Sequence, residues 1–207
     1  FMNGPALPTV NIINSIPLAL PREEILRRLG RNRHLAEISR PQQEILSRTI
    51  VEGFALCRTK AAWRRLAIIE NNSASFRLAD GSNIDSTSLC ELLTDCQEAL
   101  LLAATVGPEL GEAITQSFAS GNATAATVYD AVGSETADMA LDWLVGHLRQ
   151  RLIREGLTLT AQRFSPGYGD LGLEAQKIFF NFLAAIFADL PQHPPDGLVN
   201  QIFFVVD

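Results

Sequence analysis

Hydrophobic positions recur at the spacing of a helix face in several stretches of the chain. The clearest is the longest, residues 123–154, where an apolar stripe lies opposite a polar one. The apolar stripe consists of Leu141, Leu144, Val145, Leu148 and Leu152, and the polar stripe of Asp130, Ser134, Asp138 and Asp142. Proline in a first turn and glycine after a last turn favour further helices. These helices cover residues 21–30, a stretch that opens at Pro41, and residues 86–94, 108–117 and 173–188.

Other apolar stretches have the length and spacing of strands. Residues 99–105 are continuously apolar, which is typical of a strand buried on both faces. Residues 63–69 are a second strand, and residues 75–79 are its hairpin partner, with a turn at Asp80 and Gly81. Residues 157–163 alternate like a strand, and a last apolar run covers residues 201–206.

Strands separated by helices indicate a mixed α+β domain. We assign residues 21–207 to this domain, with a helical first part over residues 22–60. The segment over residues 1–20 contains three prolines, so we expect it to be extended.

Composition excludes several classes of protein. A net charge of −6 argues against a nucleic-acid partner, although residues 22–69 alone carry 11 Lys and Arg against 5 Asp and Glu. Apolar runs are too short to cross a membrane, and the first twenty residues lack the basic start of a signal peptide. Three cysteines without a CxxC pair indicate reduced thiols and a cytoplasmic protein, and three scattered histidines predict no metal site.

Residues 163–170 carry the clearest candidate chemistry, in the sequence Arg-Phe-Ser-Pro-Gly-Tyr-Gly-Asp. Arg163 can present its guanidinium to a carboxylate. Pro166 and Gly167 favour a turn that exposes backbone N–H and C=O groups, which can read the edge of a flat heterocycle. Tyr168 can lie against a ring or a cationic sulfonium. Asp170 can cap the following helix or pair with an ammonium group. Taken alone, the segment is first of all a tight connection.

The order of these motifs along the chain resembles the activation domain of cobalamin-dependent methionine synthase, and more closely its short stand-alone relatives. Four stretches carry the resemblance: residues 103–109 (Ala-Ala-Thr-Val-Gly-Pro-Glu), 129–134 (Tyr-Asp-Ala-Val-Gly-Ser), 163–170, and 173–176 (Leu-Glu-Ala-Gln). The resemblance extends over about residues 85–180 and, more loosely, over residues 22–57. It implies a mainly antiparallel sheet with helices packed around it.

The resemblance also implies a function. Domains of this family bind S-adenosylmethionine in a shallow groove and supply its methyl group when the cobalamin of methionine synthase has been oxidised, with one electron from a flavodoxin-like donor. Carried over by position, the ligand site comprises Arg163 on the methionyl carboxylate, the Ser165 backbone on adenine, Tyr168 along the ligand, and Pro166, Gly167 and Asp170 around it. Asp130 and Glu135 are the candidates for the acid that binds the ammonium group.

The chain would then be an accessory domain with no catalytic residue of its own, and the cobalamin would be held by its partner. That partner would be a methionine synthase or another corrinoid protein. Residues 198–202 do not match the Lys-Ser-rich strand near the end of the short relatives. This departure motivates an alternative: a protein-interaction module with the same fold and a degenerate ligand site. An independent methyltransferase ranks last, because the sequence has no glycine-rich nucleotide loop after an N-terminal strand and no general base near the motif.

Overall fold

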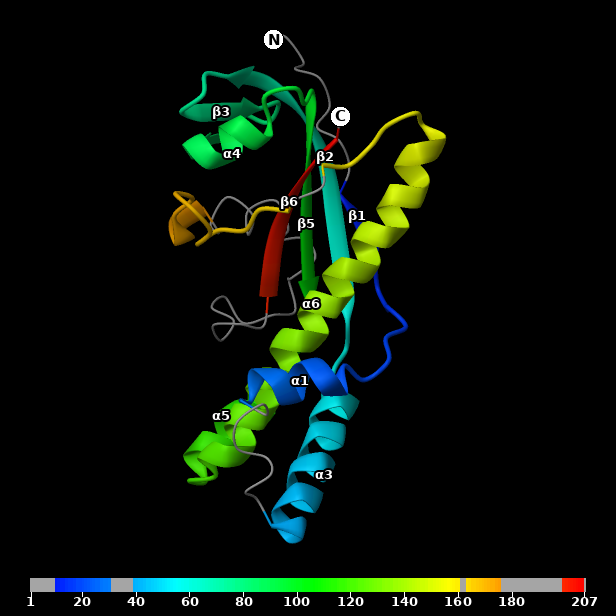
Figure 1. The fold of residues 1–207 in the computed structure, drawn as a ribbon, viewed down its shortest axis with the longest axis vertical. Coiled ribbons are helices and arrows are strands. Elements are labelled where there is room, and N and C mark those ends of the chain that lie inside the picture. Colours follow the sequence, from blue (N-terminus) through cyan, green and yellow to red (C-terminus); the bar gives the residue numbers. More distant parts are fainter. Residues whose placement is uncertain (1–9, 31–38, 161–162, 176–198, 207) are drawn as a thin grey trace, which may run out of the picture.

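A computed structural model of the chain describes residues 10–30, 39–160, 163–175 and 199–206 (Figure 1). Six strands form an antiparallel sheet in the order β4-β3-β2-β5-β6, with β1 paired to β2. The strands are β1 (Asn11–Ile13), β2 (Lys60–Asn71), β3 (Ser75–Leu78), β4 (Asn83–Asp85), β5 (Glu98–Thr105) and β6 (Val199–Val206). The fold is therefore α+β with a mainly antiparallel sheet, as the sequence predicted.

Helices gather mainly at one end of the sheet, where α1, α3 and α5 surround the first half of α6 (Figure 1). The helices are α1 (Arg22–Arg28), α3 (Arg40–Leu56), α4 (Thr87–Leu92), α5 (Pro108–Ala119) and α6 (Ala123–Arg154), and a 3-10 turn covers Leu173–Ala175. These positions confirm the five helices predicted before residue 160. Among the described residues, no helix combines the length and apolar character needed to cross a membrane.

β5 is covered on both of its faces, and this explains its nearly uninterrupted apolar sequence. Leu100 and Leu102 pack against the second half of α6, in a cluster that includes Leu141, Leu144 and Leu148. The alternate residues of β5, such as Leu101, face the opposite way and pack with β3, β4 and α4. Because both faces of this strand are covered, the six residues between Glu98 and Thr105 are all apolar and buried.

α6 joins the helical end of the molecule to the sheet. It has 32 residues and spans about 48 Å at the usual rise of a helix. Its first half crosses α3 at Gly53, where an added Cβ would lie 2.7 Å from Cδ1 of Tyr129. Its second half covers the sheet, and its apolar stripe is buried there as predicted.

The predicted hairpin was right about the strands and wrong about the turn. β2 and β3 do pair, but residues 72–74 connect them, where Ser73 adopts a φ of 70° and the Asn72 side chain accepts from the Ser75 N–H at 2.8 Å. Asp80 and Gly81 instead connect β3 to β4, a three-residue strand that the pattern did not predict.

The prediction of a strand over residues 157–163 was also wrong for the described part of that segment. Leu159 and Phe164 each form a single bridge and no continuous ladder. Leu157 and Leu159 alternate toward the core beside α6, so burial rather than strand pairing produces the pattern. The predicted helix over 173–188 begins as the 3-10 turn, and its remainder lies outside the described residues, as does the proline-rich stretch over 191–195.

Candidate functional site

The turn over residues 165–171 is closed by its own backbone. The Tyr168 N–H donates to the Ser165 carbonyl at 3.0 Å, and the Leu171 N–H donates to the Tyr168 carbonyl at 3.0 Å. The Gly167 N–H in turn donates to the Leu171 carbonyl at 2.7 Å. Gly167 has a φ of +89°, and a Cβ there would lie 2.9 Å from Leu173, so the position requires glycine. The Ser165 carbonyl keeps a second lone pair for a ligand.

Two apolar side chains anchor this turn to the core while its tyrosine projects outward. Leu171 is buried and Phe164 is half-buried in the cluster formed with β3, β4 and α4. Tyr168 is 71% exposed, and its ring meets the Phe164 ring edge-on, with 6.3 Å between centroids. A planar or cationic ligand therefore has access to the face of Tyr168.

Asp170 binds α4, which precedes it in the chain. Its carboxylate accepts from the Ser86 hydroxyl and from the Thr87 N–H, both at 2.6 Å, and from the Ser88 N–H at 3.4 Å. The hydrogen bond from Ser86 is the main reason that the pKa of Asp170 falls to about 2. Asp170 is thus a capping residue, but of α4 and not of the helix that was predicted after it.

Arg163 lies against acidic side chains of α6. Its guanidinium pairs with the Asp142 carboxylate, and the two side chains are 37% and 65% exposed. Asp138, one helical turn before Asp142, is half-buried, and burial raises its pKa although Arg163 acts in the opposite direction. The sequence predicts both carboxylates on an exposed polar stripe, which holds for Asp142 and not for the half-buried Asp138. Arg163 pairs with Asp142 and interacts electrostatically with Asp138.

The two acids predicted as ammonium partners lie earlier in α6 than Asp138 and Asp142. Glu135 pairs with Arg28 of α1 at 3.2 Å, and its carboxylate side chain is only 13% exposed. It still acts on Asp138, whose pKa it raises. Asp130 precedes Asp138 by two helical turns, which corresponds to about 12 Å along the axis. No contact within the described residues brings Asp130 to the turn.

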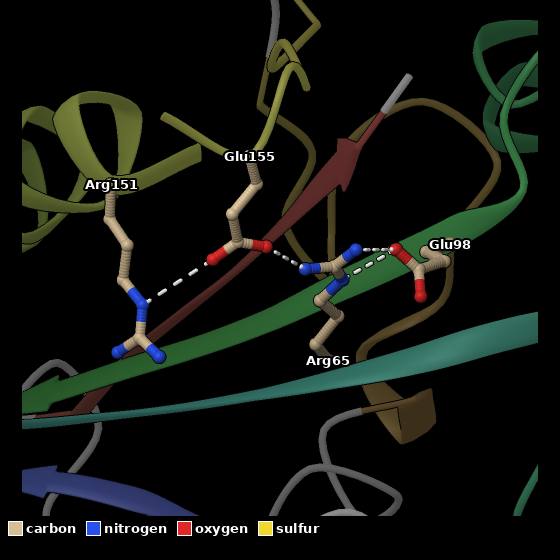
Figure 2. A network of polar contacts seen from close by, with 4 residues as sticks. All are labelled: Arg65, Glu98, Arg151 and Glu155. Carbon is tan, nitrogen blue, oxygen red and sulfur yellow. Dashed lines mark hydrogen bonds and ion pairs between the residues drawn. The ribbon is translucent and has the colours of Figure 1, made fainter. Parts of the chain in front are cut away.

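A network of charged side chains holds the end of α6 against the sheet, just before the chain leaves for Arg163 (Figure 2). Arg65 of β2 pairs with Glu98 of β5 and donates to Glu155 at 2.7 Å. Glu155 also pairs with Arg151 of α6 at 3.6 Å. The network links the end of α6 to β2 and β5. Within the described ranges, no group of His, Cys, Asp and Glu forms a metal site.

Comparison with known proteins supports the fold. No family model and no curated protein matches the chain. Among solved structures, the chain is similar to a crystal structure of the MetH reactivation domain bound to AdoHcy, with a TM-score of 0.57 and 10% sequence identity. The alignment covers 97% of this chain and 79% of that one. At this level of identity the likeness shows a shared fold and leaves the function to be argued from the site.

Proposed function

We propose that the chain binds S-adenosylmethionine between the turn over residues 165–171 and α6, and presents it to a corrinoid protein. One observation carries the proposal: Arg163, which begins the segment that leads to the exposed Tyr168, pairs with Asp142 and interacts electrostatically with Asp138. The ligand's amino-acid end carries a carboxylate and an ammonium group, so it needs a cation and an anion side by side. The similar MetH domain was crystallised with AdoHcy, the demethylated product of this ligand.

Each part of the ligand has a chemically suitable neighbour. Arg163 offers two parallel hydrogen bonds to the carboxylate once it releases Asp142. Asp138 is the acid that we assign to the ammonium group, in place of Asp130 or Glu135. Tyr168 offers its face to the sulfonium or adenine, and the Ser165 carbonyl can accept from the adenine amino group.

The chain's contribution is to position the methyl donor. Bound cobalamin on the partner would supply the methyl-transfer chemistry, and a flavodoxin-like donor would supply one electron. The described residues accordingly need no nucleophile or general base; they hold the ligand at a fixed orientation. The partner that we propose is a cobalamin-dependent methionine synthase, which this chain would reactivate as a cytoplasmic accessory protein.

Calorimetric titration tests the ligand. The wild type should bind S-adenosylmethionine and AdoHcy, and Arg163→Ala should lose at least about tenfold in affinity, because a hydrogen-bonded charge pair is removed. Arg154→Ala is the matched control, since Arg154 is an exposed arginine at the end of α6 and should be neutral. A folded wild type that binds neither ligand would refute the site, and undiminished binding by Arg163→Ala would refute the role of Arg163.

A reactivation assay tests the partner. Adding the chain to an oxidised methionine synthase that lacks its own activation domain should restore methylcobalamin in the presence of S-adenosylmethionine and a reduced flavodoxin. The Arg163→Ala variant should restore less at subsaturating ligand. Association with the corrinoid protein without any ligand binding would instead favour the alternative, an interaction module with the same fold.

A further inference from the structure

Asp170 contacts the start of α4 through both oxygens of its carboxylate. Its Oδ1 accepts from the Ser86 hydroxyl at 2.6 Å, its Oδ2 accepts from the Thr87 N–H at 2.6 Å, and both oxygens lie 3.4 Å from the Ser88 nitrogen. Ser86 is only 3% exposed and simultaneously accepts from the Leu89 N–H, so it caps α4 from within. These donors hold the carboxylate in its charged form and orient both of its oxygens toward the start of α4, although the residue itself is exposed.

The same contacts determine where the turn lies. The three backbone hydrogen bonds of the turn join residues within it and do not fix it to the rest of the molecule. Its attachment comes from the buried side of Phe164 and Leu171 and from Asp170. Gly169 continues this contact: a Cβ there would lie 3.3 Å from the Ser88 hydroxyl, so turn and helix already touch. Tyr168, two residues before Asp170, is largely exposed, and its ring meets the Phe164 ring edge-on.

We propose that Asp170 is a positioning residue, which docks the ligand-binding turn on the first residues of α4 and does not touch the ligand. This inference rests on the proposed function. Its physical basis is pre-organisation: a turn that is docked for only part of the time binds with an affinity reduced by that fraction. The Asp170 contacts tie the positions of the Ser165 carbonyl and the Tyr168 ring to the sheet and α4.

Two ligands distinguish positioning from direct contact. AdoHcy carries an amino-acid end, whereas 5′-methylthioadenosine keeps the adenosine and sulfur without it. A positioning role predicts that Asp170→Ala weakens both ligands by the same factor, about fivefold for the loss of one capping carboxylate. Ser86→Ala, which removes a buried partner of Asp170, should weaken both in the same direction. Asp80→Ala is the matched control, because Asp80 caps the β3–β4 turn through the Ser82 N–H at 2.9 Å.

A spectroscopic readout follows the turn without any ligand. The chain contains two tyrosines, so fluorotyrosine labelling gives one ¹⁹F signal from Tyr168 and one from Tyr129 on α6. Asp170→Ala should shift or broaden the Tyr168 signal and leave the Tyr129 signal in place, whereas Asp80→Ala should change neither.

The outcomes separate the two claims. A wild type that binds neither ligand overturns the proposed function and this inference with it. If the wild type binds both, then a loss confined to AdoHcy makes Asp170 a direct contact and overturns the inference alone. Unchanged affinity of Asp170→Ala, or an unchanged Tyr168 signal, also overturns it. Equal losses for both ligands with a displaced Tyr168 signal support it.

Discussion

Replacing Asp142 by Asn should make the chain bind AdoHcy more tightly. Asp142 occupies the guanidinium of Arg163, which the ligand carboxylate needs, so the protein must break this pair before it can bind. The two side chains are 65% and 37% exposed, and ion pairs with that exposure contribute about 0.2–1 kcal/mol. Removing the competition should therefore tighten binding by about 1.5- to 5-fold. AdoHcy suits the measurement because it has no net charge and long-range attraction to Asp142 cancels.

A double-mutant cycle measured by calorimetry isolates this effect. Asp142→Asn should tighten AdoHcy in the wild-type background and have no effect in Arg163→Ala, where no guanidinium is left to release. The gain should shrink as salt is added, since exposed pairs are screened. The reasoning is refuted if Asp142→Asn weakens AdoHcy, which would make Asp142 a ligand contact, or if its effect persists without Arg163.

Three further predictions concern single residues. Burial raises the pKa of Asp138, so the contribution of this residue to stability is full below the ordinary value of 3.8 and is lost as pH rises through the folded-state pKa. Asp138→Asn should therefore raise the melting temperature at pH 7 but not in acid. The same substitution should weaken S-adenosylmethionine binding. Gly53→Ala should destabilise by about 1 kcal/mol in urea unfolding, because the clash with Tyr129 exceeds the helix-propensity gain, whereas Gly146→Ala, with nothing within 4 Å, should be neutral or stabilising. Burial raises the pKa of Cys57 to about 11, so its alkylation at pH 8, followed by mass spectrometry, should be far slower in folded than in unfolded protein.

Local features of the fold were predictable from sequence because local interactions produce them. α6 begins where the Asn122 side chain accepts from the Ala125 N–H, and its end is followed by Gly156 at a φ of +76°. Both are residue types that mark helix ends. β5 was evident because its two covered faces leave the residues between Glu98 and Thr105 entirely apolar. β4 was missed since three residues are too few to show a period.

The errors have physical causes as well. A turn sequence does not say which two strands it joins, so Asp80 and Gly81 were placed in the wrong hairpin. The connection between β2 and β3, residues 72–74, has no glycine, and Ser73 adopts the left-handed conformation instead. The alternation of Leu157 and Leu159 reflects their packing beside α6, which has the same period as strand pairing.

In the candidate site, too, local features were predictable from sequence and contacts between distant residues were not. The tight turn was predicted, because Pro166 and Gly167 specify it within a few residues. The neighbours of that turn were not, since Arg163 meets Asp142 across 21 residues and Asp170 meets Ser86 across 84. No periodicity or spacing encodes such contacts. The choice of Asp138 as the acid for the ammonium group, in preference to Asp130 or Glu135, rests on its interaction with Arg163, which only the structure shows.

A crystal structure of the chain grown with AdoHcy tests the central claim most directly. The ligand should lie between the turn and α6, with its carboxylate on Arg163, its ammonium group on Asp138 and its thioether or adenine against Tyr168. Asp142 should have released Arg163, while Asp170 should still accept from Ser86 and Thr87. A ligand bound elsewhere on the molecule, or an Arg163 still paired with Asp142 beside a bound ligand, would contradict the account.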